Sequence, residues 1–326
     1  MLTNEQLAAA LDEIARKMDF PAAEVERRLA MATNPAYWQS VVPFATIERP
    51  AAVEDCGGDA PDVAREVDRL EKHGYFRFGP VIGEARVSRM RRCVEALRNA
   101  GWPAVFPFVF DDFWNVARTE PTATFLERAL GPGYRQNSRV WSHWVDGHSG
   151  ANGWLPHVDQ GESDYRKRLS IWIPLTDATI GNGCMFAVPR SAQRPDVEMR
   201  VGRRAALESA DYLFLLQNTL PLPAVAGSVL GWDGNIVHWG GVNRGDPNPR
   251  LSLALEFLAA DAPGRATELP LVDPAQPLPT MRERLFAIAT GLSRYGRFEV
   301  EINRFATFSK RLLELTRPDR EPAASG

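Results

Sequence analysis

Apolar residues in the first part of the chain recur every three or four positions, which is the spacing of one face of an α-helix. The clearest example is the stripe Val87, Met90, Val94 and Leu97, which ends before Gly101. This part of the chain is therefore predicted to be helical. Capping residues and similar spacing predict three further helices: one behind Thr3 and Gln6, one from Pro61 to Gly74, and one from Thr119 to Gly131.

From Tyr134 the pattern changes to short runs rich in β-branched and aromatic residues, separated by Gly, Pro, Asn and Asp. Only one helical candidate, residues 205–216, lies between these runs, which favours an antiparallel sandwich or barrel over a parallel α/β sheet. After Pro279 the helical spacing returns. The predicted strands are SRVWSHWV, RLSIWIPL, CMFAVP, SVLGW, NIVHWGG and RLSLALEFLA.

These patterns predict a single domain over residues 1–326, with a mostly β fold and flanking helices. No internal repeat or low-complexity linker divides it. Its expected parts are a helical N-terminal extension (1–67), a helical support (68–133), a β core (134–260) and C-terminal helices (261–326).

Composition limits the function without indicating an activity. The 326 residues carry a net charge of −3 with a pI near 6.0, so nothing in the global charge favours nucleic acid or an anionic membrane as a partner. No apolar run is long enough to span a bilayer, and the first residues lack the basic head and apolar core of a signal peptide. Three separated cysteines, Cys56, Cys93 and Cys184, exclude a fully paired disulfide framework and a cysteine zinc cluster. We expect a cytoplasmic protein whose partner is a small molecule.

The candidate chemistry begins with His157 and Asp159, which flank the single residue Val158. In an extended segment both side chains point to the same face. One imidazole and one carboxylate on one side make half of a metal site. With five histidines in the chain, this spacing also arises by chance, so the pair alone does not establish a ligand role.

A second histidine, His238, lies in a late apolar strand, where a role in the core is the commoner one. Arg250 follows it by twelve residues across a turn rich in Gly, Asn and Pro, and Ser252 shares the same face of the next strand. A buried guanidinium needs an anionic partner, and Asp246, the nearest acid, sits in the turn itself. A bound carboxylate fits this position, because Arg binds carboxylates through two hydrogen bonds and Ser donates one more.

Taken in order, the His-x-Asp pair, the distal His and the Arg-x-Ser pair resemble the phytanoyl-CoA dioxygenase-like (PhyH) branch of the iron(II)/2-oxoglutarate-dependent oxygenases. The resemblance covers residues 68 to about 258 and includes the segments LEKHGYFRF, PHVDQ, WIPLTDA and NGCMFAVPRSAQ. It implies a double-stranded β-helix, the cupin-like jelly roll, with iron bound at its open end.

The resemblance implies a role for each candidate residue. His157, Asp159 and His238 correspond to the metal ligands of the family. Three positions of the iron(II) ion then stay open, of which 2-oxoglutarate can fill two and dioxygen the third. Arg250 corresponds to the residue that holds the distal carboxylate of 2-oxoglutarate, with Ser252 beside it. Trp172 corresponds to a position that lines the cosubstrate pocket, although an inward Trp on a strand is more often simply part of the core.

Other residues near the expected substrate entrance differ from the family or have two interpretations. Relatives often have Pro-Gly-Ser-His where this chain has Pro-Arg-Ser-Ala at residues 189–192, so a polar side chain is missing there. Arg190 and Arg194 either face an anionic substrate or, as the commoner alternative, are solvated loop residues. Further candidates for the pocket wall are Tyr134, Arg139, Trp141 and His143, whereas Trp232 and Trp239 are expected to pack.

The expected activity is hydroxylation of a small organic molecule, of the kind found in secondary metabolism, with succinate and carbon dioxide as co-products. Desaturation, epoxidation and ring formation use the same residues and stay open. The rival classes are a cupin-like metal isomerase or hydrolase, a binding protein that uses no 2-oxoglutarate, and a purely structural role for these residues; Arg250 favours the oxygenase, because an isomerase needs no second grip on a carboxylate. Residues 1–65 lie outside the resemblance and are expected to form a lid or the contact of a homodimer.

Overall fold

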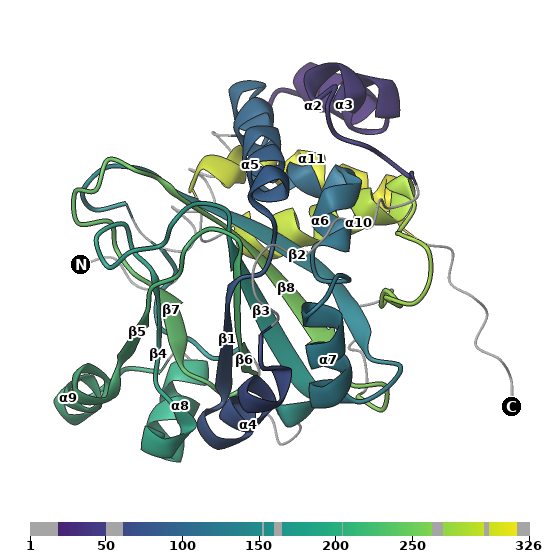
Figure 1. Cartoon of the computed structure of the whole chain (residues 1–326). Coiled ribbons are helices and arrows are strands. Elements are labelled where there is room, and N and C mark those ends of the chain that lie inside the picture. Colours follow the sequence, from purple (N-terminus) through teal and green to yellow (C-terminus); the bar gives the residue numbers. More distant parts are fainter. Residues whose placement is uncertain are drawn as a thin grey trace, which may run out of the picture.

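The computed structural model describes residues 19–49, 61–151, 153–159, 165–203, 205–262, 270–296 and 300–317. The helix predicted behind Thr3 and Gln6 lies outside these ranges. Two antiparallel β-sheets form the centre of the described structure, and helices flank them on several sides (Figure 1).

The larger sheet has the strand order β1–β6–β3–β8–β2, and the smaller one the order β5–β4–β7. Every neighbouring pair in both sheets is antiparallel. Trp172 of the larger sheet and Met185 and Leu222 of the smaller one belong to one apolar cluster, so the two sheets pack on each other. The strands are β1 (Tyr75–Pro80), β2 (Arg135–Val145), β3 (Arg168–Pro174), β4 (Met185–Ala187), β5 (Leu220–Leu222), β6 (Ser228–Asp233), β7 (His238–Gly240) and β8 (Arg250–Leu258).

Alternation along β8 separates the main core from the pocket side of the larger sheet. The odd-numbered residues from Leu251 to Phe257 are buried in the main apolar cluster, which also contains residues of helix α10. The even-numbered residues from Arg250 to Glu256 point to the opposite face, because successive side chains of a strand alternate. This face of β8 carries polar and charged side chains at both of its ends.

Helices cover the outer side and the edges of the larger sheet. Helix α10 packs on β2, and its Gly291 lies so close to the carbonyl oxygen of Val140 that a Cβ atom there would come within 3.0 Å. Helix α2 packs against α11, and Trp38 of α3 stacks on Phe106, so residues 19–49 join this helical layer. The helices are α2 (Ala22–Ala32), α3 (Pro35–Val41), α4 (Val63–His73), α5 (Glu84–Asn99), α6 (Asp111–Asn115), α7 (Thr122–Leu130), α8 (Pro195–Gly202), α9 (Ser209–Asn218), α10 (Met281–Tyr295) and α11 (Ala306–Thr316).

Most of the predicted elements are present. The stripe from Val87 to Leu97 forms the buried face of α5, and α4 ends at Gly74, which adopts the left-handed conformation at φ 76°. The expectation that strands would predominate is not confirmed, because 44% of the described residues are helical. One reason is the connection between β4 and β5, which contains two helices, α8 and α9, where the sequence predicted one over residues 205–216.

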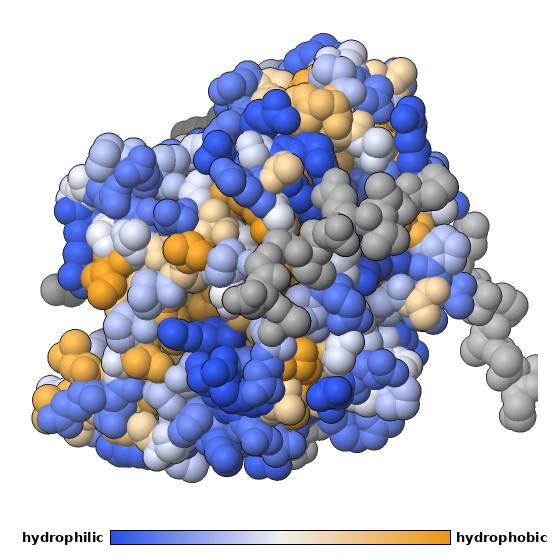
Figure 2. All heavy atoms as spheres, in the orientation of Figure 1, coloured by the Kyte–Doolittle hydropathy of each residue, from blue (hydrophilic) through white to orange (hydrophobic). Residues whose placement is uncertain are grey.

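The visible surface is mostly hydrophilic, and its apolar residues form small separate groups, including one over α9 (Figure 2). Scattered apolar side chains of this kind are normal on a folded domain. Among the described residues, no helix has both the length and the apolar character needed to cross a membrane.

A buried ion pair ties the helical layer together at the start of α10. The Arg284 guanidinium is fully buried and donates to Asp111 Oδ1 at 2.7 Å and to the carbonyl oxygen of Val109 at 2.8 Å. Asp111 also accepts hydrogen bonds from the backbone N–H groups of Glu48 and Arg49. Three segments far apart in the sequence therefore meet at one carboxylate, and the pair fixes where α10 lies.

Asp111→Ala leaves the Arg284 guanidinium buried without its counter-charge, and we expect it to lower the free energy of unfolding by about 3–5 kcal/mol. Urea unfolding followed by circular dichroism measures this loss. The control is Asp261→Ala, which removes one partner of the exposed pair Lys167–Asp261 and is expected to change stability far less. Equal effects of the two substitutions would contradict the role given to the buried pair.

Candidate active site

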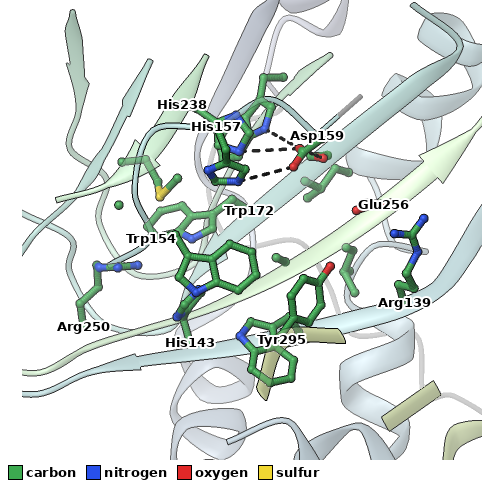
Figure 3. A pocket seen from close by; sticks show the side chains of 18 residues that line it. Arg139, His143, Trp154, His157, Asp159, Trp172, His238, Arg250, Glu256 and Tyr295 are labelled. Atoms are coloured by element: carbon green, nitrogen blue, oxygen red, sulfur yellow. Dashed lines mark hydrogen bonds and ion pairs between the residues drawn. The ribbon is translucent and has the colours of Figure 1, made fainter. Parts of the chain in front are cut away.

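Two backbone hydrogen bonds bring the predicted ligands together. His157, in the segment between β2 and β3, forms an isolated antiparallel bridge with His238 of β7, with N···O distances of 3.1 and 3.0 Å. Paired residues of such a bridge point to the same side, and the two imidazole centroids lie 4.3 Å apart. Asp159 Oδ1 lies 3.6 Å from His157 Nε2, and Asp159 Oδ2 lies 3.7 Å from His238 Nε2 (Figure 3). One possible ligand atom from each of the three side chains lies within 4.8 Å of the others.

Both imidazoles are oriented by the chain that precedes them. His157 Nδ1 donates to the carbonyl oxygen of Leu155 at 2.8 Å, and His238 Nδ1 donates to that of Ile236 at 2.9 Å. Because a carbonyl oxygen can only accept, each Nδ1 carries a proton, and Nε2 is the ring nitrogen that can bind a metal. Burial lowers the pKa of His238 below its usual value, although Asp159 opposes the shift. The neutral ring is the form that binds a metal.

Asp159 is held by two donors that the sequence did not single out for this role. Ser170 Oγ of β3 donates to Asp159 Oδ2 at 2.5 Å, and Trp232 Nε1 of β6 donates to the same oxygen at 3.1 Å. Burial alone would raise the pKa of Asp159, but His238, His157 and these two hydrogen bonds lower it overall, so the carboxylate is ionised. Trp232 was expected only to pack; its ring does lie 4.3 Å from that of His238, and its N–H adds a polar contact.

The donor set fits a divalent transition metal with open coordination positions. Two imidazoles and one ionised carboxylate are the ligand types of the two-histidine, one-carboxylate sites that bind non-heme iron(II). Both donors to Asp159 bind Oδ2, so Oδ1 carries no other hydrogen bond within the described residues. The three residues can therefore bind iron(II) and leave positions for other ligands.

Arg250, Ser252 and Trp172 also lie together, as the sequence predicted. The Arg250 guanidinium is buried, donates to Ser252 Oγ at 3.1 Å, and lies 5.7 Å from the centre of the Trp172 ring. Its Nε–H has no hydrogen-bond partner, and no carboxylate of the described residues forms an ion pair with it. Burial lowers the pKa of Arg250 to about 10, so the side chain is still a cation at neutral pH. A buried cation with an unused donor is a binding position for an anion.

The metal ligands and Arg250 line one pocket. Arg139, Trp141 and His143 line it, as proposed from the sequence, whereas Tyr134 packs against Phe257 outside it. Burial and the nearby Arg250 and His157 lower the pKa of His143 well below its usual value, so this ring is neutral as well.

Two aromatic side chains of the pocket wall were not predicted. Tyr295, the last residue of α10, and Trp154 lie with their ring centroids 4.8 Å apart, and Tyr295 lies at the same distance from Trp141 (Figure 3). The helical spacing of α10 predicts a buried face but not the strand it covers, so no signal in the sequence alone could assign Tyr295 to the site.

The two loop arginines have structural partners. Arg190 pairs with the buried Asp233 and donates to backbone carbonyl oxygens at the end of α4, so it is neither solvated nor directed at a substrate. Arg194 is more exposed and pairs with Asp196, which agrees with the solvated interpretation.

Ser170→Ala removes a hydrogen bond that orients the Asp159 carboxylate, and loss of such a contact costs roughly ten- to a hundredfold in metal affinity. Anaerobic titration with iron(II) measures the change. The matched control is Ser142→Ala, because the Ser142 hydroxyl is also buried but has no hydrogen-bond partner among the described residues. Identical iron affinities of the two variants would exclude the orienting role of Ser170.

Comparison with solved structures finds a shared fold. The non-heme alpha ketoglutarate dependent carbocyclase SnoK from nogalamycin biosynthesis is 20% identical, with a TM-score of 0.50 over 64% of this chain and 90% of that chain. EctD from S. alaskensis with bound Fe is 17% identical, with a TM-score of 0.49 over 65% and 83% of the two chains. At such low identity the likeness to SnoK is one of fold alone.

Comparison of sequences gives one family. No curated protein matches the chain, whereas the family model of phytanoyl-CoA dioxygenase (PhyH) matches residues 113–251. This stretch contains His157, Asp159, His238 and Arg250. The donor set and the family match agree with iron(II), 2-oxoglutarate and dioxygen as cofactors. The resemblance indicated by the sequence is thus confirmed, and over residues 113–251 the chain is phytanoyl-CoA dioxygenase-like.

Proposed function

We propose that the protein is an iron(II)/2-oxoglutarate-dependent dioxygenase that hydroxylates a small organic molecule. His157, Asp159 and His238 hold the metal. Arg250 and Ser252 hold the distal carboxylate of 2-oxoglutarate, and Trp172 forms the wall beside it. When bound, iron and 2-oxoglutarate activate dioxygen, so that oxidation of 2-oxoglutarate to succinate and carbon dioxide is coupled to oxidation of a substrate C–H bond.

The observation that carries this proposal is the buried Arg250 in the same pocket as the three metal ligands. A metal isomerase or hydrolase of the same fold needs the metal ligands, but it needs no further residue that binds the carboxylate of a cosubstrate. The unused Nε–H of Arg250 and the Ser252 hydroxyl, which already accepts from the guanidinium and can donate its own proton, present two donors to one anion. A dicarboxylate bound to the metal at one end and to Arg250 at the other uses both features.

The remaining residues of the pocket contribute orientation and exclusion of water. Ser170 and Trp232 hold the carboxylate of Asp159 in place, and the Nδ1–H bonds hold the two imidazoles. Aromatic side chains form one wall, which keeps water away from the reacting groups. Because Asp159 supplies the third protein ligand, no coordination position is left vacant for a halide ion, and halogenation is not expected. Hydroxylation is the simplest outcome. The carbocyclase noted above shares this fold, and ring formation is the alternative outcome.

The first test measures the reaction itself. Succinate release by the anaerobically loaded enzyme is expected to need iron(II), 2-oxoglutarate and dioxygen together, and to disappear in His238→Ala. With the substrate present, the product gains one oxygen atom from labelled dioxygen, as read by mass spectrometry. A product that loses two hydrogens without gaining oxygen would replace hydroxylation by desaturation or ring formation. Turnover indifferent to 2-oxoglutarate and oxygen would instead favour the isomerase.

Arg250→Lys separates the cosubstrate site from the metal site. Lysine keeps the charge but loses the planar two-pronged donor, and we expect it to weaken 2-oxoglutarate binding by about 1.5–3 kcal/mol, or one to two decades in affinity. Calorimetric titration of 2-oxoglutarate into the iron-loaded variant measures this loss. Arg135→Lys, on β2 and outside the pocket wall, is the control. Loss of iron with unchanged 2-oxoglutarate affinity would contradict the assignment.

A further inference from the structure

The residues next to the proposed metal ligands share an apolar cluster on the outer side of the site. Val158 lies between His157 and Asp159, and Val237 directly precedes His238. Val237 is buried in this cluster, Val158 packs against it, and neither lines the pocket. Because the ligands face the pocket, their neighbours along the chain face away from it. The buried members of this outer cluster are Val188, Val197, Val201, Leu215 and Val237.

Helices α8 and α9 form the other side of the outer cluster. Val197 and Val201 belong to α8, and Leu215 belongs to α9. Figure 1 shows both helices at the lower end of the smaller sheet, whose strand β7 carries His238. Arg200 of α8 donates to Asp211 of α9 at 2.6 Å, so an ion pair also joins the two helices. The two helices therefore pack as a unit against the outer side of the ligand segments.

Two hydrogen bonds attach the segment that leads to α8 to the chain before His238. The backbone N–H of Val188 donates to the carbonyl oxygen of Val237 at 2.9 Å. Further along, Gln193 Nε2 donates to the carbonyl oxygen of Asn235 at 3.0 Å. The position of α8 is thus coupled through the backbone to one of the two histidine ligands.

The other histidine is reached through Gly202, the last residue of α8, which lies against Val158. A Cβ atom at position 202 would be only 2.9 Å from Val158 Cγ2, closer than such atoms approach in folded proteins. The contact therefore needs glycine at this position. Val158 is branched at Cβ and has few alternative rotamers, so a side chain at position 202 would push on the backbone between His157 and Asp159.

We propose that Val158 is a positioning residue of the metal site and that α8 holds it in place from outside the pocket. The inference rests on the proposed function, because it takes His157, Asp159 and His238 as metal ligands. Val158 fixes the backbone from which the first two of these side chains project. Residues that orient metal ligands change metal affinity by about ten- to a hundredfold when they are replaced. Since coupling between two sites is reciprocal, metal binding in turn stabilises the packing of α8.

The first test measures the iron(II) affinity of the full chain by anaerobic titration. Val158→Ala removes the contact with α8 and is expected to lower the affinity about tenfold. Gly202→Ala is expected to lower it by a similar factor, because the added methyl group displaces Val158, even though alanine itself favours the helix. The double variant Val158→Ala/Gly202→Ala puts a methyl group back into the space that the first change leaves. Its iron affinity is expected to be within about threefold of the wild-type value.

Each substitution has a matched control away from the metal ligands. Val67→Ala makes the same change in a partly buried valine of α4 that packs on the main core. Gly79→Ala adds a methyl group on β1, where it would meet no atom within 4 Å. Both controls are expected to keep the wild-type iron affinity. Thermal unfolding of the metal-free proteins is measured beside the titrations, because a merely structural role of Val158 would lower the melting temperature and leave iron affinity unchanged.

Amide hydrogen exchange of the wild-type protein gives a second test that needs no variant. Binding of iron(II) is expected to slow exchange in α8 several-fold, because the metal holds the segment on which α8 packs. Helix α2 is the internal control, since it packs against α11 and is expected to exchange at the same rate with and without iron(II). If Val158→Ala does not fold, Gly202→Ala and the exchange rates decide.

The possible results separate this inference from the proposed function. Weaker iron binding in Val158→Ala than in Val67→Ala, together with slower exchange in α8 when iron(II) is bound, supports the positioning role. Iron affinities of Val158→Ala and Gly202→Ala equal to those of their controls, or exchange in α8 that does not respond to iron(II), overturn that role and leave the ligand assignment intact. A wild-type protein that binds no iron(II), or that keeps its full affinity in His238→Ala, overturns both.

Discussion

The site depends on one short contact, the pair of backbone hydrogen bonds between His157 and His238. These residues are 81 positions apart in the sequence, and one lies in a segment without regular structure while the other begins a strand of three residues. The bridge turns both imidazoles to the same side and places Asp159, two residues later, within reach of both. The backbone bridge sets where the two imidazoles lie, and the side chains of Ser170 and Trp232 then orient the carboxylate of Asp159 between them.

The larger sheet supplies the residues that surround this contact. Strands β3 and β6 hold the carboxylate of Asp159 through Ser170 and Trp232, while β8 carries Arg250 on the same face. The opposite face of β8 is buried in the main apolar cluster, and this burial compensates for the cost of placing charged side chains on the pocket face. A strand that alternates between core and pocket can therefore be both a stable centre of the fold and the wall of a polar site.

The sequence predicted what depends on spacing along the chain and failed where the answer depends on contacts between distant segments. His157, Asp159 and His238 were recognisable from residue type and order, and Arg250 from its position after a turn. Ser170 was missed, because its role follows from the register of β3 against β6, which no local pattern encodes. Tyr295 was missed for the same kind of reason: it enters the pocket only because α10 docks on β2. The excess of helix has a similar origin, since α8 and α9 fill a connection whose fold is set by packing.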